Sequence, residues 1–135
     1  MKRINVEQID FSDDYSYTHN GVRFSGVGYE LDASGRLICE ITFVNGVQVG
    51  PRREWYPSGR KKAEDNIHRG GGLHGLSFEW YESGQLKQKT IAEFGIVLER
   101  DEWDEAGNLL ESIRLSESDP NYRLLEKERR REENR

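Results

Sequence analysis

A small residue followed by glycine recurs four times at nearly constant spacing in this chain of 135 residues. The four glycines are separated by 24, 25 and 23 residues, and the dipeptides are Ser34-Gly35, Ser58-Gly59, Ser83-Gly84 and Ala106-Gly107. The residues four positions before these glycines are Leu31, Trp55, Trp80 and Trp103. Each of these four residues directly follows a glutamate. A period of roughly 20–50 residues indicates a repeat architecture. The chain is therefore expected to stack several copies of one small unit.

Each unit has the sequence pattern of a β-hairpin. In the third copy, the segments 75–81 and 86–91 alternate in side-chain character on either side of Ser83-Gly84. Alternation with period two around a glycine-containing loop is typical of two antiparallel strands. Between copies, Asn45-Gly46 favours a type I′ turn, which needs two residues with positive φ. We expect an all-β fold, an elongated antiparallel meander of about four hairpin repeats and eight strands, followed by a short C-terminal α-helix.

The two ends of the chain differ from this pattern. Residues 1–20 are expected to form a lead-in or a short edge strand, and residues 21–115 the repeat β-domain. Asp119-Pro120 is a helix start signal, with Asp as N-cap and Pro in the first turn. Residues 116–135 are therefore expected to form a capping helix and tail. Its apolar residues lie near its start, so we expect the first turn to dock and the arginine-rich remainder to fray.

The apolar content is low for a core of this length, with 34% hydrophobic and 33% charged residues. A thin stack of hairpins accounts for this, because each unit needs to bury only one face against its neighbours. The column of Leu31, Trp55, Trp80 and Trp103 is expected to be the packing spine of the sheet. Cys39 alternates with apolar neighbours and is expected to be a small core residue.

The net charge of −5 argues against two classes of partner. Phosphate binding needs a basic field, so nucleic acid is not expected, and anionic membrane surfaces are disfavoured for the same reason. A cationic protein is the more natural complement. The single cysteine, the absence of a signal-peptide pattern at the N-terminus and the absence of a long apolar run together predict a cytoplasmic protein.

Two copies of the repeat carry a family resemblance. The runs Glu54-Trp55-Tyr56-Pro57-Ser58-Gly59 and Glu79-Trp80-Tyr81-Glu82-Ser83-Gly84 resemble MORN-variant repeats. The lead-in, with Phe24-Ser25-Gly26 after an acidic, tyrosine-rich stretch, is similar to that of bacterial YwqK-family antitoxins. The resemblance implies a non-enzymatic role as the antitoxin or immunity partner of a toxin, within a toxin–antitoxin system. It also leaves open a MORN-type scaffold or a lipid-associated interaction module.

The proposed partner-binding residues lie on the strand face opposite the tryptophans. These residues are Glu54, Tyr56, Glu79, Tyr81, Glu102 and Asp104. Tyrosine contributes rigid contact area and the carboxylates steer a basic partner, although a merely hydrated face explains the same pattern. The carboxylates recur once per hairpin, about 10 Å apart, which is wider than the roughly 5–9 Å of a catalytic dyad.

Other candidate sites have less support. The acidic run could imitate nucleic-acid phosphate and block the basic cleft of a nuclease, or could be hydrated surface; its members are Glu99, Asp101, Glu102, Asp104 and Glu105. A basic set is expected to pair with acids across strands; its members are Arg52, Arg53, Arg60, Lys61 and Lys62. The three histidines are isolated in sequence, so no metal site is expected, and no cofactor motif or nucleophile arrangement supports an enzyme. A homodimer through an edge strand remains an alternative assembly.

Overall fold

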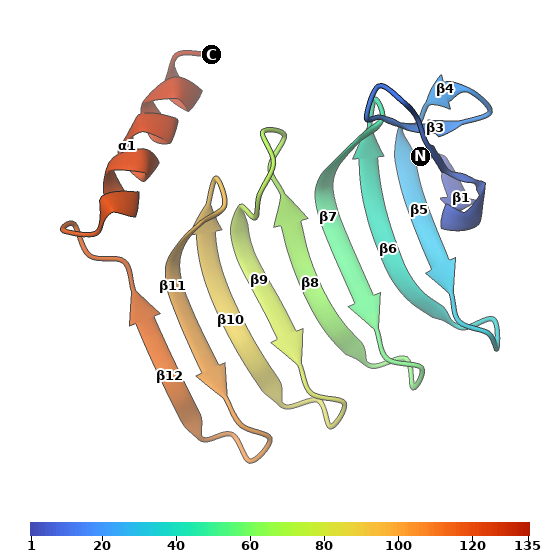
Figure 1. Ribbon diagram of the computed structural model, residues 1–135. Coiled ribbons are helices and arrows are strands. Elements are labelled where there is room, and N and C mark those ends of the chain that lie inside the picture. Colours follow the sequence, from blue (N-terminus) through green and yellow to red (C-terminus); the bar gives the residue numbers. More distant parts are fainter.

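The computed structural model, which describes residues 1–135, is a single-layer sheet with a small N-terminal lobe and one helix (Figure 1). Eight consecutive antiparallel strands form the meander, so the predicted all-β repeat fold is confirmed. The strands are β5 (Gly26–Leu31), β6 (Leu37–Val44), β7 (Val47–Trp55), β8 (Lys61–Ile67), β9 (Gly75–Trp80), β10 (Leu86–Glu93), β11 (Ile96–Trp103) and β12 (Leu109–Arg114).

The turns of the meander follow the glycines of the repeat. The glycine of each small-residue–Gly dipeptide has a φ between 81° and 95°, a region that favours glycine. Asn45 and Gly46 both have positive φ, which confirms the predicted type I′ geometry. Phe94 and Gly95 form a further pair of this kind, with φ of 53° and 79°. The sequence did not indicate that turn, because phenylalanine rarely adopts positive φ.

The lead-in packs over the β5 end of the sheet. Its elements are β1 (Arg3–Asn5), the 3₁₀-helix η1 (Val6–Gln8), β2 (Asp10–Phe11), β3 (Tyr17–His19) and β4 (Val22–Arg23). The expected edge strand is present as β1, which pairs in parallel with β5. At that junction a Cβ on Gly26 would lie 2.3 Å from the Lys2 carbonyl oxygen, so only glycine fits. The small sheet β2-β3-β4 extends to residue 23.

The hydrophobic core lies under this lead-in and not along the tryptophan column. Its buried members are Ile4, Phe24 and Phe43, with Ile9, Tyr17 and Ile41 packed against them. The prediction of a tryptophan packing spine is therefore wrong: Leu31 is exposed and the three tryptophans are half-buried. The physical reason is that no second layer covers the repeats. Trp80 instead stacks on Phe78 of its own strand, with ring centroids 5.6 Å apart.

The C-terminal helix α1 (Pro120–Glu133) begins as predicted, with Asp119 as its N-cap. The prediction that its second half frays is wrong. Leu125 is 1% exposed, and Arg129 pairs with Glu93 at 2.6 Å. Glu132, near the helix end, pairs with Arg69 of the β8–β9 turn, also at 2.6 Å. Ion pairs with distant parts of the chain thus anchor the last turns of α1, which carry no apolar residue.

Candidate functional site

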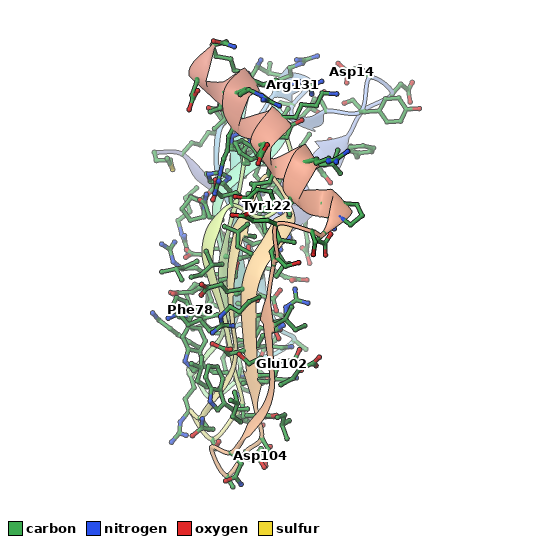
Figure 2. All side chains as sticks on the ribbon, turned by 90° about the vertical axis from the view of Figure 1, so that its left-hand side faces the viewer. Asp14, Phe78, Glu102, Asp104, Tyr122 and Arg131 are labelled. Atoms are coloured by element: carbon green, nitrogen blue, oxygen red, sulfur yellow. The ribbon has the colours of Figure 1, made fainter.

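One face of the sheet carries a continuous cross-strand row of residues, which we call the carboxylate row. Directly opposed residues of an antiparallel sheet point to the same side. The row, from β5 to β12, is Glu30, Cys39, Glu54, Ala63, Glu79, Gln88, Glu102 and Glu111. Figure 2 views the sheet nearly edge-on and places Glu102 and Phe78 on opposite sides. We call the side of the row the carboxylate face and the other side the paired face.

None of the five glutamates of this row takes part in an ion pair. On the paired face the corresponding acids are all matched by cations. Glu64 pairs with Lys61 at 2.8 Å and with Arg53 at 3.7 Å. Asp101 pairs with Arg114 at 2.9 Å, and Glu40 pairs with Arg3. The two faces thus differ in how their acids are matched: those of the paired face have ion pairs within the chain, and the five glutamates of the carboxylate row have none.

Three of the predicted partner-binding residues lie in this row. Glu54, Glu79 and Glu102 are each separated by two strand steps, so the expected spacing of about 10 Å agrees with the strand pairing. Glu111 at the end of the row was missed by sequence reasoning. It is opposite Glu102 on the returning strand, and only the hairpin pairing identifies it.

The other three predicted residues, Tyr56, Tyr81 and Asp104, make hydrogen bonds that stabilise the repeats. The hydroxyl of Tyr56 donates to the Trp80 carbonyl oxygen at 2.7 Å, and Tyr81 donates to that of Trp103 at 2.9 Å. The Asp104 carboxylate accepts from the main-chain N–H groups of Ala106 and Asn108, each at 2.9 Å. These hydrogen bonds hold the pKa of Asp104 below its usual value, those from Asn108 most strongly.

Cys39 lies in the row and not in a core, so that prediction is wrong. It is half-buried beside Glu30 and Glu54, because the lead-in does not reach this part of the sheet. Burial raises the pKa of its thiol to about 11, and the charges of Glu54 and Glu30 add to the effect. The thiol is therefore mostly protonated at neutral pH, which slows its reaction with electrophiles.

The acidic run from Glu99 to Glu105 does not form one patch. Strand alternation sends Glu102 to the carboxylate face, while Glu99 and Asp101 lie on the paired face beside Arg114. A phosphate-like array of all five acids is therefore not present, because neighbouring residues of a strand point in opposite directions. Asp104 belongs to the following turn, where its hydrogen bonds are local.

The predicted pairing across strands is confirmed for two of the five members of the basic set, Arg52 and Arg53, and a third, Lys61, pairs within its own strand β8. Arg52 forms a two-pronged pair with Asp65, at 2.7 and 2.9 Å, in addition to the Arg53 and Lys61 pairs with Glu64. The remaining two have other partners. Arg60 donates to the Ser83 carbonyl oxygen at 2.6 Å in the next repeat, and the Lys62 ammonium lies 5.6 Å from the centre of the Tyr56 ring.

Two of the histidines, isolated in sequence, meet in space. The rings of His68 and His74 lie 4.8 Å apart and both contact Phe94. His74 Nδ1 accepts the Phe94 N–H at 3.1 Å, which helps to hold the unusual turn at Phe94-Gly95. No three His, Cys, Asp or Glu side chains converge as a metal-binding group. No helix of the chain has the length and apolar character needed to cross a membrane.

The free edge of the sheet is β12. All six of its residues are exposed, among them Leu109, Leu110 and Ile113. At the opposite edge stands β1, a strand of three residues. A long exposed edge strand is a template for pairing with another chain, so the homodimer that the sequence leaves as an alternative assembly stays a prediction, with β12 as the more exposed edge.

Comparison with known proteins identifies one repeat. The family described as MORN repeat variant matches residues 73–91, which include β9, the Ser83-Gly84 turn and most of β10. No curated protein and no solved structure matches the chain. The matched hairpin is one of the four copies defined by the glycine spacing, and its neighbours have the same strand order and turn geometry. The chain therefore contains a MORN repeat variant, at residues 73–91, within a meander of similar hairpins.

Proposed function

We propose that this protein is a non-enzymatic binding protein of the antitoxin or immunity type, which neutralises a toxin by direct protein–protein contact. The observation that supports it most is the contrast between the two faces of the sheet. The acids of the paired face have cationic partners within the chain, whereas five glutamates of the carboxylate row have none. A surface of this kind complements a basic protein surface.

Coulomb's law gives the size of the charge interactions that the proposal invokes. Neighbouring glutamates of the row about 10 Å apart repel each other by about 0.4 kcal/mol at the dielectric constant of water. A partner cation at about 4 Å from a carboxylate gains about 1 kcal/mol under the same conditions, and more when water is excluded. Binding of a basic surface would therefore relieve repulsion and gain attraction at several points, and charge would also accelerate association.

The experiment is co-expression with the toxin-like protein encoded by a neighbouring gene, with growth rescue and binding affinity as the readouts. We expect the wild type to restore growth. The triple variant Glu54→Gln, Glu79→Gln, Glu102→Gln should bind at least about tenfold more weakly and protect poorly. The matched control changes three unpaired glutamates elsewhere: Glu105→Gln, Glu117→Gln and Glu133→Gln. Equal protection by the two triple variants would contradict the assignment of the binding face.

The MORN-type scaffold or lipid-associated module is the alternative function. It predicts binding to anionic phosphatidylserine vesicles at about 0.15 M salt, where only charges close to the membrane surface act. We expect no co-sedimentation, because the chain carries a net charge of −5 and the vesicle surface is also negative. Co-sedimentation of the wild type, and not of a charge-reversed variant of Arg60, Lys61 and Lys62, would favour the alternative over the antitoxin role.

A further inference from the structure

A second cross-strand row, on the paired face, is apolar and open to solvent; we call it the tryptophan row. Each of the four hairpins contributes two directly opposed residues, and only one of the eight is charged. The row, from β5 to β12, is Leu31, Leu37, Trp55, Lys61, Trp80, Leu86, Trp103 and Leu109. None of these residues is buried. An apolar row that crosses eight strands without a cover is a candidate interaction surface.

Two open hollows of the same construction lie between the tryptophan row and the turns. The first, of about 430 Å³, is lined by Arg36, Leu37, Trp55, Pro57, Ser58 and Gly59. The second, of about 480 Å³, is lined by Arg60, Lys61, Trp80, Ser83 and Gly84. Each therefore combines a tryptophan, the Ser-Gly turn that follows it and an arginine of the preceding turn. The hollows recur with the repeat, so a ligand that occupies both must lie across the strands.

The indole of Trp80 presents a flat surface to the second hollow. Phe78, which marks the paired face in Figure 2, stacks on this ring from two residues earlier in the strand, with centroids 5.6 Å apart. The hollow lies toward the turn that follows Trp80. The Lys61 ammonium lies 5.9 Å from the centre of the same ring, on a side chain that is 56% exposed. A ligand here meets an aromatic surface beside an exposed cation.

The side chains of both hollows are rich in hydrogen-bond donors and poor in acceptors. Arginine, lysine and tryptophan only donate, and no carboxylate or amide side chain lines either hollow. A sugar chain carries many hydroxyl donors, which would need acceptors. An α-helix has no free carbonyl along its sides. A proline-rich segment fits best, because proline has no N–H and a polyproline II helix leaves its carbonyls free to accept.

The repeat distance agrees with the same ligand. Trp55, Trp80 and Trp103 follow one another at two strand steps, about 9.6 Å. A polyproline II helix has three residues per turn and rises about 9.3 Å in each turn. Over two repeats its mismatch is about 0.6 Å, whereas α-helical residues spaced by seven, about 10.5 Å apart, differ by about 1.8 Å. Residues on one side of a β-strand are about 6.7 or 13 Å apart and do not match.

The charge of this region favours acidic residues in the ligand. Arg60 has no ion pair and donates only to the main-chain carbonyl oxygens of Glu82 and Ser83. Lys61 shares its one acid, Glu64, with Arg53. In the first hollow, by contrast, Arg36 is matched by Asp32 at 3.3 Å. The cations that lack a full partner therefore lie at the second hollow. A single-stranded nucleic acid would also combine stacking surfaces with negative charge, but the net charge of −5 opposes a polyanion.

We propose that the tryptophan row binds a proline-rich, acidic segment of a protein partner in the polyproline II conformation. The segment runs across the strands. Prolines at every third position pack against Trp55, Trp80 and Trp103, and acidic residues on a neighbouring edge of the segment reach Arg60 and Lys61. The inference goes beyond the proposed function, because it assigns a second partner surface on the opposite face of the sheet and does not require a toxin.

The test uses two synthetic peptides of proline and glutamate with identical composition. In the matched peptide glutamate stands at every third position and so lies on one edge of the polyproline II helix; in the control peptide glutamates at i, i+2 and i+4 point to three different edges. Titration calorimetry should show the full-length protein binding the matched peptide about tenfold more tightly. Equal affinity for the two peptides would overturn the proposal, since only charge and composition would then be recognised.

Two further measurements examine where and what the row binds. Saturation with the matched peptide should shift the tryptophan emission to shorter wavelengths, because the indoles lose contact with water; binding without a shift would place the peptide elsewhere. An oligodeoxythymidine of the same length should bind more weakly than the matched peptide. Tighter binding of the oligonucleotide would assign the row to single-stranded nucleic acid and overturn the proposal.

Substitutions in the second hollow should weaken binding of the matched peptide. We expect a loss of at least about tenfold for Trp80→Ala and about threefold for Arg60→Gln. Arg60 is exposed, so its variant tests the hollow even if Trp80→Ala does not fold. The matched controls are Phe11→Ala and Arg123→Gln, exposed residues outside the row, which should bind as the wild type does. Wild-type affinity of both hollow variants in folded form would show that the proposal is wrong.

The triple glutamine variant of the carboxylate row separates this inference from the proposed function. It should bind the matched peptide as tightly as the wild type, whether or not it still neutralises a toxin. Loss of the peptide in this variant would overturn the assignment to the paired face. A failure of the toxin experiment alone leaves the peptide measurements unchanged, because the two experiments use opposite faces of the sheet.

Discussion

The hydroxyl of Tyr56 donates a 2.7 Å hydrogen bond to the main-chain carbonyl oxygen of Trp80, which lies one repeat further along the chain. Tyr81 makes the equivalent bond to Trp103. In the first and last copies the tyrosine position is taken by Asp32 and Asp104, whose carboxylates accept N–H groups of their own turns. The tyrosines thus join consecutive hairpins, and the aspartates at the two ends of the array stabilise single turns.

Loss of these tyrosine bonds should destabilise the repeat array. Tyr56→Phe and Tyr81→Phe each remove one hydroxyl and leave a half-buried carbonyl without its partner. We expect each substitution to lower the free energy of unfolding by about 0.5–1.5 kcal/mol in urea titrations. Tyr15→Phe is the control, because Tyr15 is 84% exposed and should tolerate the change. Unchanged stability of both repeat variants would mean that water replaces the lost bonds.

Docking of the C-terminal helix should depend on one buried leucine. Leu125 is 1% exposed and its neighbour Leu124 is 52% exposed. Leu125→Ala should cost about 2 kcal/mol or more, whereas Leu124→Ala should be nearly neutral. Hydrogen exchange provides the measurement: residues 120–133 should lose protection in Leu125→Ala while β6 to β11 keep theirs. Equal protection in both variants would show that the ion pairs alone hold the helix.

The Glu93–Arg129 ion pair should make helix docking sensitive to acid. The hydrogen bond from Arg129 lowers the pKa of Glu93 below its ordinary value of 4.5. Because the folded-state pKa is the lower one, the stabilisation is complete above about pH 4.5 and is lost as the pH falls through the folded-state value. The protection factors of the α1 amides should therefore fall as the pH drops below about 4.5.

The matched control for this pH effect is Glu93→Gln. Glutamine does not titrate, so the acid-induced part of the change in α1 should become smaller, and the helix should be less protected at neutral pH. A variant with the same acid response as the wild type would assign that response to other carboxylates. Asp101 is the main competitor, since Arg114 and Ser112 lower its pKa as well.

The Cys39 thiol should react slowly with alkylating reagents. With a pKa of about 11, on the order of one thiol in a thousand is ionised at pH 8. We expect modification with iodoacetamide to be on the order of a hundredfold slower than in the urea-unfolded chain. Glu54→Gln should accelerate it, because the Glu54 charge raises this pKa. A rate equal to that of the unfolded chain would show that the hollow beside Cys39 opens freely.

Local sequence signals predicted the repeat and most of its turns. Asn45-Gly46 and Ser83-Gly84 specify their backbone conformations through residues adjacent in the chain, so the hairpins follow from them directly. The start of α1 at Asp119-Pro120 is equally local. The turn at Phe94-Gly95 was not predictable in this way, since its stabilising contacts come from His68 and His74, about 20 residues or more away.

Contacts between segments far apart in the chain determine which side chains are buried and which charges are paired. Burial depends on what covers a strand, and the lead-in covers Phe43 but leaves Trp55 and Trp80 half-buried. Strand pairing likewise decides which charges meet, so Glu64 is neutralised and Glu79 is not. No one-dimensional pattern distinguishes these two glutamates.

Turns and strand alternation depend on neighbouring residues, so the hairpin, its period and the face on which each side chain lies can be read from the order of the residues alone. Which faces are covered and which glutamates are unpaired follows instead from the three-dimensional arrangement of the strands. These properties depend on the pairing of strands and on the docking of the two chain ends, which join residues far apart in the chain.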